Sequence, residues 1–385
     1  MELDDLGTTP LRAEPSVEPE LGVSIIVCCH NSEGRLPPTL AHLARQKISA
    51  EIRWEVLVID NASTDRTGEV ARQVWPKRGP APLQVLSEPR PGKAHALARG
   101  LAAARYEFLG IIDDDNWVSE DWVAIAYSQM LAHPDVGIVG SAGRPVFEVS
   151  PPAWFRHAEM MYAITPTDWQ AGDFTHRPGT LFGAGMVVRK SAWQWVRDLD
   201  CPELMSGRLK GSMAAGEDTE LCYQLRLAGW KLWFEPRLQF QHFLPAARLR
   251  WEYVRGMYYG TGEAAARCRP YELSLDTADR RQKGRYRYSW SFMLLMAIKN
   301  LVRHPVSLAS ALLLRQEGNP HALRLADLTG QIRMLLRLRS KYESQVLEVQ
   351  RFSARLRRGV GATPRPPVAS AGKEPTNADA VPSTR

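Results

Sequence analysis

Two groups of acidic residues in this sequence have the types and spacing needed for chemistry on a charged substrate. The first is Asp113-Asp114-Asp115, which directly follows the apolar run at residues 107–112 (EFLGII). Three successive carboxylates repel one another, and Mg²⁺ or Mn²⁺ would neutralise them, with water and substrate phosphates completing the coordination. A polar turn that caps the next helix is the alternative interpretation.

The second group contains Glu217, Asp218 and Glu220, and it lies at the predicted start of a helix. Carboxylates stabilise a helix N-terminus through the macrodipole, which is a purely structural interpretation. A carboxylate that faces a cation-bound diphosphate can instead act as a general base and accept the proton of an attacking hydroxyl. The residues alone leave both interpretations open.

The elements that must position these groups alternate between short apolar runs and helical patterns. The predicted strands are residues 23–28, 55–60, 83–86 and 107–112. The first helix is predicted to begin near Pro37 and Pro38, and Ser63 or Thr64 is predicted to cap the second. This alternation predicts an α/β fold with a mainly parallel sheet flanked by helices.

Polar residues cluster where these strands end. Residues 28–31, the pair Asp60-Asn61 and the three aspartates each follow the last apolar residue of a strand. Ligands of parallel sheets bind outside the carboxyl ends of the strands. We therefore expect three strand ends to surround one binding crevice.

Six segments occur in an order that resembles one known family. They are VSIIVCCHNSEG, VIDNASTD, PGKAHALARG, GIIDDDNW, GTLFGAGMVVRKSAW and GEDTELCYQLRLAGW. Residues 22–243 thereby resemble family 2 glycosyltransferases of the GT-A fold, of the non-processive type found in bacterial polysaccharide biosynthesis. The resemblance implies a Rossmann-like sheet and inverting transfer of a sugar from a nucleotide diphosphate sugar to an acceptor hydroxyl.

The resemblance also implies roles for individual residues. Asp115 would be the direct metal ligand, with Asp113 and His242 completing the site for Mn²⁺ or Mg²⁺. Asp218 would be the catalytic base, and Glu217 its neighbour. The positions that would contact the nucleotide sugar are Cys29, Asn31, Asp60, Asn61, Lys93, Asp113 and Asp114.

Some positions carry more than one interpretation or depart from the family pattern. His242, beside Phe240, is also typical of a hydrogen-bonded core histidine. Asn61 stands where family members commonly carry a second aspartate that reads the base. Its amide can still pair with uracil or thymine, so we expect a UDP- or dTDP-linked donor. Arg99 replaces a frequent asparagine, and either contacts the diphosphate or is solvated.

Composition limits the class of protein. The 385 residues carry a formal charge of +7, with the excess late in the chain, but no nucleic-acid motif accompanies it, so we expect no nucleic-acid partner. The five cysteines show no CxxC spacing and are expected to be reduced. The first charges are acidic, which is not typical of a secretory signal and predicts a cytoplasmic protein.

The predicted organisation is a disordered segment at 1–20, a GT-A domain at 21–270, a mostly helical, basic extension at 271–358 and a disordered tail at 359–385. The apolar run at 290–298 is too short to cross a bilayer. It is expected either to lie on an anionic membrane surface, at the inner face of the plasma membrane, or to pack as a helix. Residues 321–357 are expected to form one amphipathic helix, with any break at Gly330.

The expected acceptor is a glycan or a lipid-linked glycan. Trp154, Phe155, Trp169 and Phe174 are expected to stack on sugar rings or to belong to the core. Arg250-Trp251 matches part of the QxxRW motif of processive enzymes without its glutamine, which predicts single addition. The rival interpretations are a nucleotidyltransferase on a related fold and a non-catalytic protein that binds sugar nucleotides.

Overall fold

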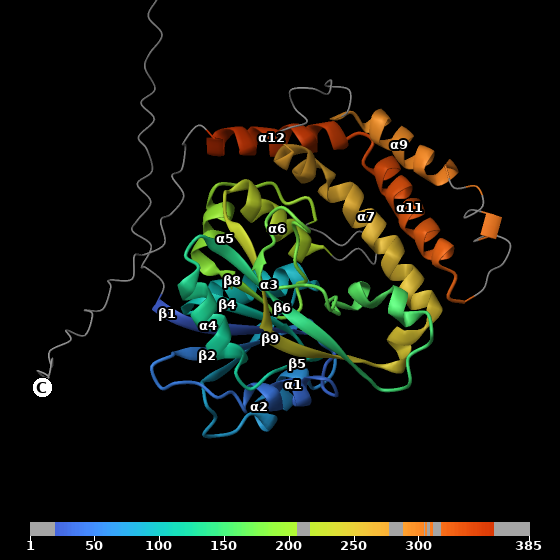
Figure 1. The fold of residues 1–385 in the computed structure, drawn as a ribbon. Helices are drawn as coiled ribbons and strands as arrows, with labels where there is room; N and C mark the ends of the chain where they lie inside the picture. The colour runs from blue at the N-terminus through green and yellow to red at the C-terminus, as the bar shows by residue number, and fades with distance from the viewer. Residues whose placement is uncertain are drawn as a thin grey trace, which may run out of the picture.

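Strands and helices alternate along the chain and form one central sheet covered by helices (Figure 1). The computed structural model describes residues 20–205, 216–276, 288–303, 305, 309–310 and 317–357. The predicted disordered ends lie outside the described residues, apart from Glu20, which begins the first strand.

The sheet is mixed, with a parallel half formed by the N-terminal strands. Within the described ranges its order is β3-β2-β1-β4-β8-β6-β9-β5, and β7 also pairs with β9. The strands are β1 (Glu20–Cys29), β2 (Trp54–Asn61), β3 (Leu83–Glu88), β4 (Tyr106–Asp113), β5 (Asn116–Val118), β6 (Val136–Phe147), β7 (Gly172–Asp173), β8 (Met186–Arg189) and β9 (Lys231–Leu244). Strands β1 to β4 are parallel, whereas β8 runs antiparallel to both β4 and β6.

Helices cover both faces of this sheet because successive strand residues point to opposite sides. They are α1 (Leu36–Leu43), α2 (Thr67–Val74), α3 (Lys93–Ala103), α4 (Trp122–Ala132), α5 (Lys190–Asp198) and α6 (Glu217–Leu227). Ile25 of β1 packs with Leu40 of α1 and Trp122 of α4 in one buried cluster. Ile26 packs on the other face with Leu97 of α3, in the cluster to which α5 and α6 also contribute.

The first two helices begin where local chemistry allows. Pro37 occupies the first turn of α1, as predicted, where a missing backbone N–H costs nothing. The cap predicted for α2 at Ser63 or Thr64 is wrong. Asp65 instead accepts a hydrogen bond from the backbone N–H of Thr67 at 3.0 Å.

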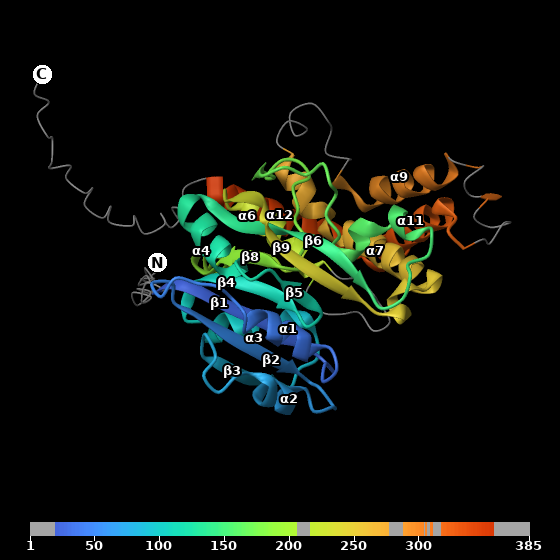
Figure 2. The same ribbon diagram turned by 60° about the horizontal axis from the view of Figure 1, so that its bottom comes forward.

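The C-terminal helices form a separate layer beside the sheet (Figure 2). They are α7 (Trp251–Leu275), α9 (Trp290–Val302), α11 (Pro320–Arg337) and α12 (Tyr342–Arg357). Helix α7 continues past the domain boundary expected at residue 270. The single helix expected at 321–357 is wrong, because α11 ends at Arg337 and α12 begins at Tyr342.

Gly330 lies inside α11 rather than at its end, and the packing of α7 explains why a glycine stands there. A Cβ at Gly330 would lie 2.1 Å from the carbonyl oxygen of Tyr259, and one at Gly262 would lie 1.9 Å from that of Asp327. The two glycines therefore allow the backbones of α7 and α11 to approach closely.

Helix α9 packs on one side and is exposed on the other. Trp290 Nε1 donates to the carbonyl of Leu335 at 2.6 Å, whereas Leu295 and Val302 are 61% and 58% exposed. The segment therefore packs as a helix on its neighbours, and its contact with a membrane surface stays a prediction. Within the described ranges, every helix is too short or too polar to span a bilayer.

The aromatic residues considered for sugar stacking belong largely to the core. Trp154 and Phe155 are buried in one cluster, and Trp169 and Phe174 pack against another. All five cysteines are free thiols.

Candidate active site

The polar ends of the parallel strands meet at one edge of the sheet. In the pairing register Cys29 lies opposite Asp60, and Cys28 lies opposite Asp113. The residues that follow β1, β2 and β4 are therefore neighbours in space, as the sequence predicted.

Each of the three successive aspartates is neutralised by a different basic residue. The pairs are Asp113 with Lys93, Asp114 with Arg35, and Asp115 with Arg248. Arg35 lies in the loop before α1, and Lys93 is the first residue of α3. The repulsion inferred from the sequence is thus relieved by three separate cations that belong to the chain.

Asp115 is the most deeply placed carboxylate of the three, with 2% of its surface exposed. Strand β5 holds it against β9, because the backbone N–H of Phe243 donates to the Asp115 carbonyl at 2.9 Å. Burial raises the pKa of Asp115, but the contacts of its carboxylate with His242 and Arg248 outweigh burial and bring the pKa to about 2. The side chain is therefore ionised at neutral pH.

His242 is brought beside Asp115 in the orientation that a metal ligand requires. Its Nε2 lies 3.5 Å from Asp115 Oδ1, and its Nδ1 lies 2.7 Å from the carbonyl oxygen of Tyr162. A carbonyl only accepts, so the hydrogen resides on Nδ1 and the Nε2 lone pair points toward Asp115. The buried Oδ2 of Asp115 also has no aligned hydrogen-bond donor.

These two donors fit a divalent cation that takes its other ligands from water and phosphate. Asp113 does not join them, because its Oδ1 contacts the ammonium of Lys93. Over the described ranges, no three His, Cys, Asp or Glu side chains converge as metal ligands. The three residues predicted to hold the metal are therefore not all brought together: Asp115 and His242 lie side by side, whereas Asp113 pairs with Lys93.

Asn61 is committed to the loop between β3 and α3. Its Nδ2 donates to the carbonyls of Glu88 at 3.1 Å and Arg90 at 2.6 Å, and its Oδ1 accepts from the N–H of Gly92 at 2.8 Å. Gly92 has a φ of 129°, a conformation that favours glycine. The amide expected to read a base thus positions the loop that leads to Lys93.

The other residues expected to contact the nucleotide sugar differ in accessibility. Asp60 is partly exposed at the strand end, while the Cys29 side chain is buried, so Cys29 offers only its backbone to a ligand. Asn31 is exposed, and its Oδ1 accepts from the backbone N–H of Thr64 at 2.8 Å. Arg99 is exposed on α3.

Asp218 lies at the N-terminus of α6 and is held by two backbone N–H groups. Gly183 donates to its Oδ2 and Thr219 donates to its Oδ1, each at 2.8 Å. Burial raises the pKa of Asp218, and Lys93 and the two hydrogen bonds oppose that rise. A Cβ at Gly183 would lie 2.8 Å from Asp218 Oδ2, so this glycine permits the contact.

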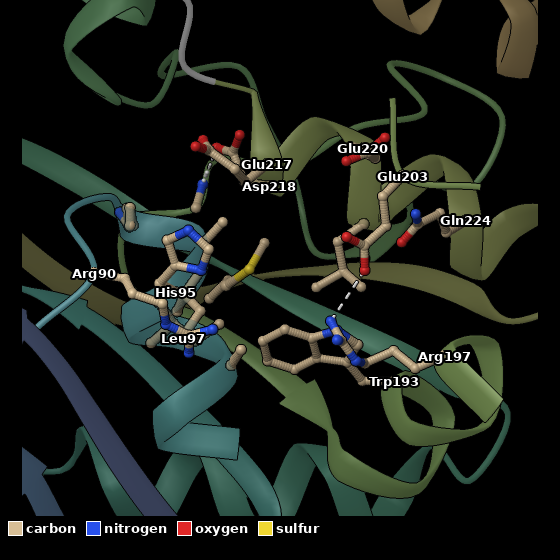
Figure 3. A pocket seen from close by; sticks show the side chains of 17 residues that line it. Arg90, His95, Leu97, Trp193, Arg197, Glu203, Glu217, Asp218, Glu220 and Gln224 are labelled. Atoms are coloured by element: carbon tan, nitrogen blue, oxygen red, sulfur yellow. Dashed lines mark hydrogen bonds and ion pairs between the residues drawn. The ribbon is translucent and has the colours of Figure 1, made fainter. Parts of the chain in front are cut away.

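Asp218 lines a cavity of about 360 Å³ between α3, α5 and α6 (Figure 3). Glu217 and Asp218 lie together in the close-up, across from His95 of α3. Lys93 also lines the cavity, and its ammonium pairs with the carboxylate of Asp113. Lys93 therefore lies between the cavity that contains Asp218 and the three successive aspartates. Trp193 and the ion pair of Arg197 with Glu203, at 3.2 Å, lie on the α5 side.

Sequence reasoning missed three residues that organise this site. Arg35 and Arg248 neutralise aspartates, and Tyr162 accepts a hydrogen bond from His242 through its carbonyl oxygen. Tyr162 belongs to the short 3-10 helix η2 (Glu159–Tyr162), and Arg248 to η3 (Ala246–Leu249). Neither stretch has a motif that marks it as part of the site. The only available signal was the proximity of Arg248 to His242 in the sequence.

The fold defines an α/β protein whose acidic and basic side chains gather where its parallel strands end. The sequence matches the family described as glycosyl transferase family 2 at residues 24–190, and that described as glycosyl transferase family group 2 at residues 109–336. The second match spans more than half of the chain. The protein therefore belongs to glycosyl transferase family group 2.

Curated relatives are distant. A poly-beta-1,6-N-acetyl-D-glucosamine synthase of Staphylococcus aureus is 22% identical over 244 residues, which cover 60% of this chain and 53% of the synthase. The succinoglycan biosynthesis protein ExoM of Rhizobium meliloti is 23% identical over 251 residues, which cover 64% of this chain and 75% of ExoM. The chain thus spans about half the length of the synthase.

Solved structures also resemble this one at low sequence identity. S. aureus TarS in complex with UDP matches with a TM-score of 0.43 and 18% identity, over 83% of this chain and 91% of TarS residues 1–349. The same protein in complex with UDP-GlcNAc matches with a TM-score of 0.42 and 17% identity, over 83% of this chain and 92% of TarS residues 1–349.

Proposed function

We propose that this protein is an inverting glycosyltransferase that moves a sugar from a nucleotide diphosphate sugar to an acceptor hydroxyl. The observation that carries the proposal is Asp218, a carboxylate fixed at a helix N-terminus on the wall of a cavity. Its raised pKa suits a base, because a more basic carboxylate takes a proton more readily at neutral pH. Family membership supports the same reaction class.

The donor would bind across the polar strand ends. Lys93 begins α3, where its ammonium and the helix N-terminus both favour a diphosphate. The base is proposed to be uracil or thymine, because an asparagine amide offers both a hydrogen-bond donor and an acceptor. Because Asn61 already uses both groups on the 88–92 loop, base binding would require it to exchange a partner.

A Mn²⁺ or Mg²⁺ ion is proposed to be held by Asp115 and His242. When bound, the ion would neutralise charge that develops on the leaving diphosphate. Lys93 would add a second positive charge on the same side, and its ion pair with Asp113 keeps its ammonium in place. Glu217 would remain beside the base, with its carboxylate accepting from the N–H of Gly216 at 3.1 Å.

In the proposed reaction the acceptor hydroxyl approaches Asp218 from within the cavity. Its proton passes to a carboxylate oxygen of Asp218, which retains lone pairs beside the bond to Gly183 or Thr219. The acceptor oxygen forms a bond to the anomeric carbon while the bond from that carbon to the phosphate oxygen breaks. Attack opposite the leaving group inverts the anomeric configuration.

The test replaces the base without changing its shape. Asp218→Asn is expected to bind the donor normally and to lower kcat about 10²–10⁴-fold, as loss of positioned proton transfer generally does. Glu203→Gln is the matched control, because Glu203 lines the same cavity but pairs with Arg197. A near-normal kcat in Asp218→Asn would remove Asp218 from the mechanism.

The proposed setting is the synthesis of a cell-surface polysaccharide or glycan, by single additions to a glycan or lipid-linked acceptor at the inner face of the plasma membrane. The supporting feature is the exposed stripe of Leu295, Ile298 and Val302 on α9, with Lys299 and Arg303 exposed beside it. Such a face suits insertion at an anionic lipid surface.

Membrane contact is tested by flotation with vesicles that contain phosphatidylglycerol. Wild-type protein is expected to float, and the double variant Leu295→Glu, Ile298→Glu is expected to stay in the soluble fraction. Vesicles of phosphatidylcholine alone serve as the uncharged control. Equal flotation of both proteins would reject α9 as the contact.

A further inference from the structure

We propose that the guanidinium of Arg248 occupies the cation position of this site in the metal-free protein and that a divalent cation must displace it to bind. The inference rests on the metal-dependent donor binding of the proposed function. It assigns to Arg248 a positioning role: it holds the two metal ligands while the ion is absent and lowers the affinity of the site for that ion.

The geometry of one nitrogen carries the inference. Arg248 Nη1 lies 2.8 Å from Asp115 Oδ2 and 3.1 Å from His242 Nε2. These are the carboxylate and the imidazole nitrogen that face each other at 3.5 Å. A metal bound to both would lie about 2 Å from each donor, which places it in the volume that this nitrogen fills. Two cations cannot share that volume.

The surroundings of Arg248 permit the exchange. The Tyr162 hydroxyl donates to the backbone carbonyl of Arg248 at 2.8 Å, and the Tyr162 carbonyl accepts from His242 Nδ1 at 2.7 Å. One buried tyrosine therefore fixes both the imidazole ring and the backbone of Arg248. The arginine side chain is 30% exposed, so it can rotate toward solvent while the metal ligands keep their places.

The neighbouring aspartates do not need this arginine. Asp113 pairs with Lys93 and Asp114 pairs with Arg35, so Asp115 is the carboxylate that Arg248 neutralises. The displaced guanidinium would remain tethered at the rim of the site, where a diphosphate is a favourable partner for it. Metal binding should consequently be weak in the free protein and stronger when a nucleotide diphosphate is present.

The test is calorimetric titration of the nucleotide-free, full-length protein with MnCl₂. Arg248→Gln removes the competing charge and is expected to bind Mn²⁺ at least about tenfold more tightly than the wild type, equivalent to about 1.4 kcal/mol. Arg35→Gln is the matched control, because it removes a cation from the adjacent Asp114 without freeing Asp115. We expect its affinity for Mn²⁺ to change less than threefold, on the order of the usual effect of a screened neighbouring charge.

Unchanged or weaker Mn²⁺ binding by Arg248→Gln would overturn the proposal, as would an equal gain in Arg35→Gln. If Arg248→Gln does not fold, Arg248→Met serves instead, since its side chain carries neither a charge nor a hydrogen-bond donor that could make these two contacts. Its affinity is expected to exceed that of the wild type. The titration involves no catalysis, so its failure is distinguishable from that of the proposed function, which the Asp218→Asn rate decides.

Discussion

Glu220, two residues after the proposed base, gives the protein a pH-dependent stability that can be measured without any substrate. Its carboxylate is buried and accepts hydrogen bonds from the N–H of Met205 at 3.0 Å, from the N–H of Leu204, and from the Tyr271 hydroxyl at 2.8 Å. Burial raises its pKa from 4.5 to about 7, because these three bonds offset only part of the desolvation and the charge of Glu203 adds to it.

The direction of the effect follows from the raised pKa. The folded protein binds a proton at Glu220 more tightly than the unfolded chain does. The stability that this group contributes is therefore complete below pH 4.5 and is lost as the pH rises through about 7. Each tenfold change in proton affinity is worth about 1.4 kcal/mol, so the loss should reach about 3 kcal/mol.

Glu220→Gln imitates the protonated side chain, since its amide oxygen can accept the same three hydrogen bonds and it carries no charge. We expect the variant to match the wild type at pH 5, below most of the transition, and to exceed its free energy of unfolding by up to about 3 kcal/mol at pH 8. Urea unfolding at pH 5, 6, 7 and 8, followed by tryptophan fluorescence, measures this difference.

Comparison of the two proteins at each pH cancels the titration of every other group, so the difference curve isolates Glu220. Tyr271→Phe provides a second check, because loss of a donor to the carboxylate should raise its pKa further and move the transition to higher pH. Parallel stability curves for Glu220→Gln and the wild type between pH 5 and 8 would refute the reasoning.

Two further predictions concern the α7–α11 crossing and Lys93. Gly330→Ala places a Cβ 2.1 Å from the Tyr259 carbonyl and should lower the free energy of unfolding by about 1–3 kcal/mol in chemical denaturation, whereas Gly34→Ala, where nothing lies within 4 Å, should have little effect. Equal stability of the two variants would contradict the close crossing. Lys93→Met removes the charge that lowers the pKa of Asp218, so the acidic limb of the kcat profile against pH should move to higher pH. An unmoved limb would show that Lys93 does not tune the base.

Local patterns were sufficient to predict the parts of the site that lie at element ends. The β-branched runs predicted β1, β2, β3 and β4, and the turn from each strand to the next element located Asp60 and Asp113 at one edge of the sheet. The acidic start of α6 located Asp218 in the same way. These predictions succeed because hydrophobic periodicity and helix capping are encoded by residues close together in the chain.

The break between α11 and α12 was beyond such reasoning. The apolar spacing continues across residues 338–341, and Gly330 offered the stronger local signal for a helix end. Packing decided otherwise, because Gly330 is needed where α11 crosses α7. A glycine required by a distant backbone has the same sequence signature as a glycine that ends a helix.

The sequence by itself determined that carboxylates would gather at the ends of the parallel strands and that Asp218 would begin a helix. Only the tertiary structure decided how these charges are balanced. Arg248 and His242 converge on Asp115 because β9 and the turn after it return to the strand ends, and Tyr162 holds both residues from another part of the chain. Such partners depend on long-range packing, which residue spacing along the chain does not encode.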